Sequence, residues 1–166
     1  EGGRGGPQRR DAVGAGRERV IAATRAMITR TFTFAIVGSL EYTVRGGRLP
    51  NWVKTIADTL RLMPVLHTKP DGRVAPGGVL FGRSHLRSRF ARYVRRRMPP
   101  GHRYRVLVAH GHAEAEGHAL LGELAGPDVI YSRLTHCGSA LGVHGGPGML
   151  VVAVQQYEPP RPLDSP

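Results

Sequence analysis

Cysteine, lysine and long apolar runs are scarce in this 166-residue chain. The single cysteine, Cys137, excludes an intrachain disulfide framework and a zinc site built from cysteines alone. The longest apolar run, from Met149 to Val154, is far shorter than the roughly 20 residues that cross a bilayer as a helix. The sequence therefore predicts a globular protein that is stabilised by an ordinary hydrophobic core.

Acidic residues are also few, and the chain carries a formal net charge of +12 at pH 7. Twenty-two of its 24 basic residues are arginine, the exceptions being Lys54 and Lys69. Nine arginines fall between Arg83 and Arg105, which is typical of an anion-binding or nucleic-acid-binding surface, although a coding bias toward arginine produces the same composition. Few aromatic rings accompany them, whereas a platform for single-stranded nucleic acid needs stacking faces. A basic anion- or nucleic-acid-binding module stays open as an alternative, but nucleic acid is not the partner that we expect.

The two ends of the chain differ in composition from its middle. Residues 1–16 are rich in glycine and arginine and cannot bury enough apolar surface to order themselves. Residues 158–166 include four prolines and are also expected to be disordered. One domain is therefore predicted over residues 17–157.

Strands and helices alternate along the second half of this domain, which predicts an α/β layered fold. Apolar residues spaced three to four apart predict helices, and short apolar runs predict strands. The helices are expected over residues 17–30, 40–45, 50–62, 83–98 and 113–124, and the strands over 31–37, 63–68, 74–81, 104–110, 129–134 and 149–154. The helix over residues 50–62 is predicted to bury Trp52, Val53, Ile56 and Leu60.

The stretch from Gly142 to Gly148 places four glycines and a proline around His144. Glycine leaves backbone N–H groups accessible and the imidazole adds a donor, so this stretch can bind an oxyanion or a carboxylate. His144, Gly145 and Gly146 are the candidate binding residues. The alternative is a tight turn whose histidine faces solvent. Residues 138–148 are expected to form a loop with at most one helical turn.

Further histidines begin at the end of a predicted strand. His110 and His112 alternate there, and His118 and His136 follow. Alternating histidines can ligate a metal ion, but this spacing matches no metallohydrolase motif. Histidines that are satisfied by hydrogen bonds or that face solvent are the favoured interpretation, and no metal or other cofactor is predicted. Cys137, next to His136, is interpreted as an inert, partly buried thiol rather than an activated one.

Arg48 follows a predicted helix that ends at Gly46 and Gly47. An arginine at this position can satisfy the last carbonyl groups of the helix. The functional alternative is that its guanidinium group projects into a pocket as the partner of an anion. Both interpretations stay open.

Several of these segments together resemble one family. The stretch from Ser39 to Leu49 resembles the leucine-glutamate-tyrosine and glycine-glycine-arginine signature of the DegV family, and Leu141 to Gly148 is similar to its carboxyl-terminal histidine loop. Leu62 to Leu66, Asp71 to Val74 and Val106 to His110 match the family's proline-centred strand, the turn after it and a strand that ends in Ala-His. Gly145, Met63 and Phe81 stand where the family usually has threonine, lysine and arginine.

The resemblance covers roughly Thr31 to Val154 and implies the carboxyl-terminal domain of a DegV-type two-domain α/β fold, with a mixed β-sheet packed with helices. It implies that the family's first domain is missing from this chain. Known members hold a long-chain fatty acid in an apolar tunnel, which the helices over residues 17–30 and 50–62 could line. They present its carboxylate to a separate or fused kinase, which forms an acyl phosphate for phospholipid metabolism. The resemblance thus implies a cytoplasmic bacterial carrier that is not itself an enzyme.

On this resemblance His144 takes the position of the carboxylate-binding histidine and Arg48 that of the arginine near the head group. The chain contains no Gly-x-x-x-x-Gly-Lys-Ser/Thr loop, so catalysis is expected on a separate ATP-binding subunit or domain. The cluster of arginines could dock an acidic kinase surface or make transient contact with anionic lipid head groups.

Overall fold

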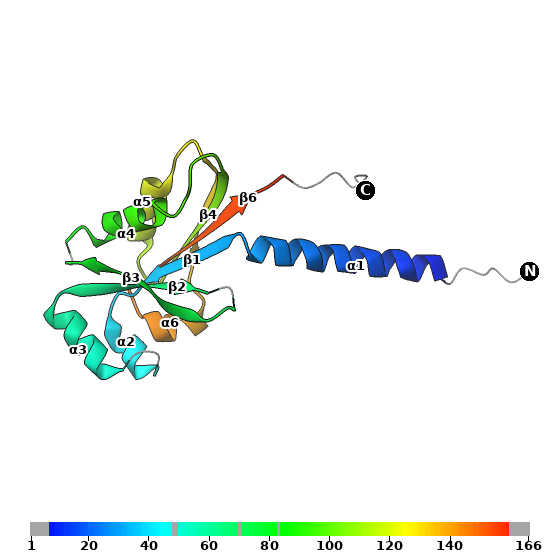
Figure 1. The fold of residues 1–166 in the computed structure, drawn as a ribbon. Coiled ribbons are helices and arrows are strands. Elements are labelled where there is room, and N and C mark those ends of the chain that lie inside the picture. Colours follow the sequence, from blue (N-terminus) through cyan, green and yellow to red (C-terminus); the bar gives the residue numbers. More distant parts are fainter. Residues whose placement is uncertain (1–6, 48–49, 70, 83, 160–166) are drawn as a thin grey trace, which may run out of the picture.

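A six-stranded mixed β-sheet forms the centre of the molecule (Figure 1). The computed structural model describes residues 7–47, 50–69, 71–82 and 84–159. The strands lie in the order β3-β2-β1-β6-β4-β5, where β4 and β5 are parallel and the other neighbours are antiparallel. Their bounds are β1 (Thr31–Ile36), β2 (Leu62–Thr68), β3 (Val74–Phe81), β4 (Arg103–His110), β5 (Val129–His136) and β6 (Leu150–Tyr157). The predicted α/β class with a mixed sheet is confirmed.

Helices cover both faces of this sheet (Figure 1). On one face lie α4 (Leu86–Arg95) and α5 (Glu114–Leu124), and α5 is the crossover that joins the parallel strands β4 and β5. On the other face lie α2 (Leu40–Arg45), α3 (Asn51–Thr59) and α6 (Ser139–Gly145). The core under α4 and α5 is fully buried and includes Phe90, Val94, Leu120, Leu124, Val106, Val108 and Val152.

The predicted helix over residues 40–45 matches α2 at both ends. The Ser39 hydroxyl accepts a hydrogen bond from the Glu41 backbone N–H at 3.2 Å, which is the expected N-terminal cap. At the other end, the backbone N–H of Gly46 donates to the carbonyl of Tyr42 at 2.9 Å. Local capping thus specifies this short helix.

Strand β3 contains two glycines, Gly77 and Gly78, where it faces α4. A Cβ atom on Gly78 would lie 2.8 Å from the ring of Tyr93 on α4. The Tyr93 hydroxyl donates to the carbonyl of Gly77 at 2.8 Å. The two glycines therefore let α4 pack directly onto the backbone of the strand.

The first helix, α1 (Pro7–Ile28), begins ten residues before the predicted start at residue 17. The expected disorder of residues 1–16 is therefore wrong for residues 7–16, while residues 1–6 lie outside the described part. A helix closes its hydrogen bonds within its own segment, so poor burial did not exclude it. The side chains from Gly16 to Thr29 are exposed, and α1 projects away from the sheet (Figure 1).

The predicted tail begins within the described part of the chain. Glu158 forms an ion pair with Arg30, just beyond the end of β6. Residues 160–166 of that predicted disordered tail lie outside the described residues.

The buried face predicted for α3 is wrong. Trp52 is 66% exposed, Ile56 47% and Leu60 60%. The helix instead packs through Ala57, which is buried, and Val53, which is half-buried. Amphipathic spacing identified an apolar face, but the described residues contain no further layer to cover it.

A helix, α6, replaces most of the loop that was predicted over residues 138–148. Glycine within a helix costs about 1 kcal/mol relative to alanine, which argued against a helix here. Tertiary packing overrides this cost, because the carbonyl of His144 accepts a hydrogen bond from the Thr43 hydroxyl of α2 at 3.0 Å.

None of the helices within the described residues is long and apolar enough to cross a membrane.

Candidate functional site

The helices α2 and α6 are about 100 residues apart in the chain, and they contact each other at three places. Thr43 donates its hydroxyl to the carbonyl of His144. The ring of Tyr42 packs on Gly146, where it occupies the space that a Cβ atom would need. The ring of His144 packs on Gly46 in the same way. The sequence placed Thr43 and Tyr42 only within a family signature, and their contact with α6 was not predicted.

His144 is the most informative residue of this contact. Its Nδ1 atom is buried and has no hydrogen-bond partner. We assign the ring proton to Nε2, because a proton on Nδ1 would be buried without an acceptor. An Nε2–H group is a donor of the kind that a carboxylate accepts.

Gly145 and Gly146 shape the turn after α6. Gly145 is buried, and a side chain on it would collide with Met149. Gly146 has a φ of +67°, which favours glycine, and its N–H already donates to the carbonyl of Gly142 at 2.9 Å. The structure therefore assigns Gly146 to the geometry of the turn, because its backbone donor is already engaged.

Arg48 lies outside the described residues, so both interpretations of its side chain remain predictions. The last described residues before it are Gly46 and Gly47. The Gly47 N–H donates to the carbonyl of Val44 at 2.9 Å and closes the end of α2.

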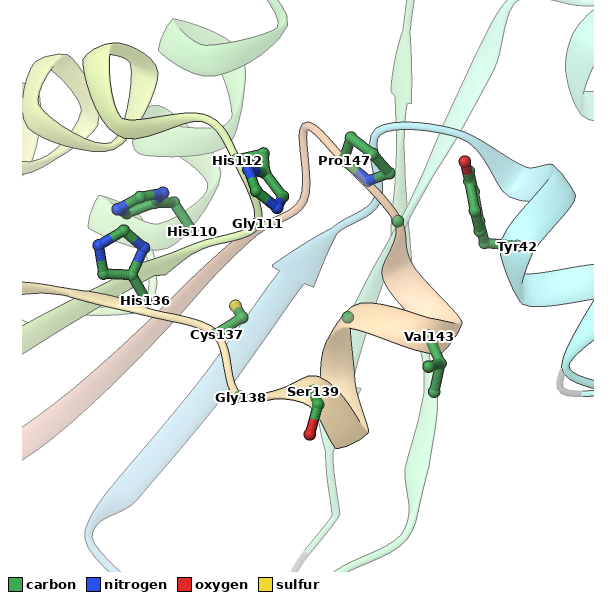
Figure 2. Close-up of a pocket in the computed structure, with 12 residues that line it drawn as sticks. Tyr42, His110, Gly111, His112, His136, Cys137, Gly138, Ser139, Val143 and Pro147 are labelled. Carbon is green, nitrogen blue, oxygen red and sulfur yellow. The ribbon is translucent and has the colours of Figure 1, made fainter.

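A pocket of about 390 Å³ opens beside α6, at the carboxyl ends of β4 and β5 (Figure 2). His110 and His136 are paired in register there, and their ring centroids lie 4.4 Å apart. His112 and Cys137 also line this pocket, and Figure 2 shows Tyr42 across it from the two paired rings. His144 does not belong to the lining. The structure thus brings together three of the four histidines of the predicted cluster, His110, His112 and His136, and leaves out His118.

A metal site is not supported by this cluster. No group of three or more histidine, cysteine or acidic side chains could hold a metal ion among the residues described. His118 lies on the exposed side of α5, 3.9 Å from the Glu114 carboxylate. Burial raises the pKa of the Cys137 thiol, which favours its protonated form.

The arginines of α4 and the residues after it form two groups. Arg87 pairs with Glu123 and Arg95 pairs with Asp128, each at 2.8–2.9 Å. The second group is Arg89, Arg92, Arg96 and Arg97, which line an open groove of about 710 Å³ against the edge strand β3. Within the described part of the chain, none of these four arginines forms an ion pair. The Arg97 guanidinium lies 3.5 Å from the centroid of the Tyr93 ring, which holds it in the groove.

A family model described as "Uncharacterised protein, DegV family" matches residues 12–156 of this chain. The chain belongs to the DegV family. The family therefore agrees with the resemblance that was drawn from the segments around Glu41 and His144.

Relatives of known sequence and structure support this membership. A DegV domain-containing protein of Clostridium perfringens is 29% identical over 140 residues, which cover 84% of this chain and 50% of the relative. A structure described as fatty acid binding of a DegV family protein from Thermus thermophilus is 26% identical, with a TM-score of 0.70, and the match covers 84% of this chain and 50% of that one. DegV from Bacillus subtilis, described as a fatty acid binding protein, is 25% identical over the same shares, with a TM-score of 0.66.

This DegV chain spans about half the length of the curated relatives it matches. The fold is therefore shared with about half of each relative, and any activity of the whole relative is only proposed for this chain.

Proposed function

We propose that this chain binds a long-chain fatty acid and presents its carboxylate to a kinase. The observation that carries the proposal is the match to the fatty-acid-binding DegV protein of Thermus thermophilus, at 26% identity and with a TM-score of 0.70. Two features of the structure support it. One is a set of exposed apolar side chains, and the other is the buried, unpartnered Nδ1 atom of His144.

The apolar surface lies mainly on the helices of one face of the sheet. Trp52, Ile56 and Leu60 follow one another at intervals of four residues on α3 and are 47–66% exposed. Leu141 and Val143 of α6 and Phe81 of β3 are 52–71% exposed. Each buried methylene group contributes about 0.8 kcal/mol, so an acyl chain against such a surface supplies most of the affinity.

The head group interacts with His144 and Arg48 in this proposal. The Nε2–H group of His144 donates to the carboxylate, while Gly145 and Gly146 allow the tight turn that holds α6 against α2. A hydrogen bond to a charged group contributes about 1.5–3 kcal/mol, which orients the ligand more than it binds it.

The proposal extends to the system in which the chain works. It is the carboxyl-terminal domain of a two-domain carrier, whose first domain completes the acyl tunnel. The carrier is not the catalyst: a separate or fused ATP-binding kinase transfers phosphate to the presented carboxylate. The carrier works in the bacterial cytoplasm in phospholipid metabolism, and its arginines make transient contact with a membrane surface.

The test uses the only tryptophan of the chain as a reporter. Because Trp52 is 66% exposed, covering it with an acyl chain shifts its emission to shorter wavelength. Palmitate is expected to produce a saturable shift and a complex of one fatty acid per chain in native mass spectrometry. His144→Gln is expected to weaken palmitate about tenfold, a factor equal to about 1.4 kcal/mol.

Hexadecanol, which lacks the carboxylate, is the matched ligand control, and His102→Gln is the matched variant. Neither is expected to show the His144-dependent change. No complex with palmitate, or an equal effect of His144→Gln on palmitate and hexadecanol, would contradict the proposal.

The groove lined by Arg89, Arg92, Arg96 and Arg97 favours a second candidate function, a basic anion- or nucleic-acid-binding module. Binding of this kind releases counterions, so affinity for a polyanion falls steeply as salt concentration rises. Arg92→Gln with Arg96→Gln is expected to flatten the salt dependence of binding to single-stranded DNA, while Arg73→Gln is not. A flat salt dependence in the unaltered chain would reject this candidate.

A further inference from the structure

The pocket at the carboxyl ends of β4 and β5 is a candidate site in its own right. Clefts outside the carboxyl ends of parallel strands are a common place for ligands in α/β folds. Its volume of about 390 Å³ lies within the range of sites for small molecules. The face of α6 that lines it carries Ser139, Gly142, Val143 and Gly146, whereas the ring of His144 packs on Gly46. The pocket therefore does not include the ring of His144, although it shares Val143 and Gly146 with the surface and the turn proposed for the fatty acid.

His110 is the fixed element of this pocket. It is only 3% exposed, and its Nδ1 atom accepts a hydrogen bond from the Ala113 backbone N–H at 3.3 Å. The proton of the neutral ring therefore lies on Nε2, which has no partner among the described residues. Because His110 lines the pocket and its Nε2 atom is not among the buried unpartnered atoms, this donor is open to the pocket and available to a ligand.

Two further histidines complete the polar lining. The ring of His136 lies against that of His110 at 4.4 Å between centroids and holds it in place. His112 comes from the residue pair after β4 and has a φ of +50°, an uncommon backbone conformation that concentrates at functional sites. No aspartate or glutamate is among the described residues that line the pocket, so its imidazoles face no competing carboxylate.

We propose that this pocket binds a small organic anion through its carboxylate or phosphate group. The Nε2–H of His110 donates to an oxygen of that group, and His136 and His112 supply further donors from the rim. The remaining lining, which includes Tyr42, Val143 and Pro147, accommodates the organic part of the ligand.

The test follows the histidines themselves in the complete chain, labelled with 15N at histidine. Long-range 1H–15N spectra at constant pH are recorded during titrations with inorganic phosphate, with acetate and, at equal ionic strength, with sodium chloride. The ligand-free spectrum is expected to show His110 protonated on Nε2. One or both oxyanions are expected to move the signals of His110 and His136 saturably, and phosphate alone or acetate alone identifies the class of ligand.

Variants decide whether the pocket is responsible. His136 is exposed, so His136→Gln is expected to keep the fold and to weaken the oxyanion at least tenfold. His112→Gly, which suits the positive φ, is a second variant with the same expected direction. His102→Gln, at the opposite end of β4, is the control and is expected to leave affinity unchanged.

Shifts that do not saturate, that sodium chloride reproduces, or that persist unchanged in both His136→Gln and His112→Gly would overturn the proposal. No fatty acid is present in any of these measurements, so the result does not depend on the proposed lipid ligand.

Discussion

Single glycines decide how closely α6 approaches α2. The ring of His144 packs where a Cβ atom on Gly46 would lie, and Tyr42 does the same at Gly146. Gly46 has a φ of −77°, so α2 alone does not require a glycine there and the requirement comes from the ring of His144. Gly146 is required both by its own φ of +67° and by the ring of Tyr42. The position of the His144 ring therefore depends on the absence of a side chain at Gly46.

Gly46→Ala tests this dependence. The added methyl group collides with Nδ1 of His144, so the free energy of unfolding is expected to fall by about 1–3 kcal/mol. Gly122→Ala on α5 is the matched control, since nothing lies within 4 Å of its Cβ position. Alanine there is expected to raise the free energy of unfolding by up to about 1 kcal/mol. Urea denaturation measures both, and equal effects would contradict the steric argument.

Tyr104 provides a prediction about pH. Burial, followed by the negative charge of Asp128, raises the pKa of its hydroxyl above 10.0, while Arg95 opposes the shift. The folded state therefore holds this proton more tightly than the unfolded state. The stability from Tyr104 is complete below pH 10 and is lost as the pH rises through the folded-state pKa.

Tyr104→Phe should remove this alkaline loss. It also removes the hydrogen bond to the carbonyl of Pro99 at 2.7 Å, so it is expected to lower stability by about 1 kcal/mol at pH 8. Urea denaturation at pH 8 and pH 10.5, with absorbance titration of the tyrosines, measures both effects. A wild-type chain in which no tyrosine titrates late would refute the prediction.

At the scale of elements, α4 has an apolar inner face and two ion pairs that anchor it. Phe90 and Val94 are fully buried, and Leu86 is half-buried. Arg95 holds Asp128 through both of its terminal nitrogens at 2.9–3.1 Å, which ties the end of α4 to the segment before β5. This two-pronged geometry is stronger than a simple surface ion pair.

Arg95→Met is expected to lower the free energy of unfolding by about 1.5–3 kcal/mol, since it leaves Asp128 without its charged partner. The control is Arg73→Met. Arg73 pairs with Asp71 at 3.9 Å and its side chain is 85% exposed, so the loss should stay within about 0.5 kcal/mol. Thermal or urea unfolding distinguishes the two, and a loss at Arg73 as large as that at Arg95 would contradict the argument.

At the scale of the whole molecule, the chain is a packed sheet layer with one long helix projecting from it. Strand β1, which follows α1, pairs with β6 near the end of the chain, so both ends leave the molecule on the same side (Figure 1). The projecting helix carries exposed apolar residues such as Val20 (66%) and Ile28 (59%). Stability is therefore concentrated in the sheet and in the helices packed against it.

Removal of residues 1–28 is expected to change the melting temperature by no more than a few degrees, because the side chains from Gly16 to Thr29 bury almost nothing. Leu120→Ala, which empties a fully buried position on α5, is expected to cost about 2–5 kcal/mol. Calorimetry measures both changes. A comparable loss on removing α1 would show that the helix supports the sheet.

The positions of most strands and of α2 could be predicted because their signals are local. Alternating apolar residues mark β1, and the Ser39 cap and Gly46 mark the ends of α2. His144 and Cys137 could be singled out for the same reason, from their neighbours in the chain. The burial of the His144 Nδ1 atom without a partner could not be predicted, because it depends on contacts with Gly46 and Thr43, which are distant in the chain.

Residue types and their spacing along the chain were enough to predict the periodicity of the elements, the excess of arginine and the family. The tertiary structure decided which apolar faces are covered: Trp52 has a suitable spacing for burial, but no described layer lies over it. It also made a helix of the glycine-rich segment around His144 and brought His110 and His136 to one pocket. Burial and contact between distant residues depend on how the elements pack, and spacing along the chain does not contain that information.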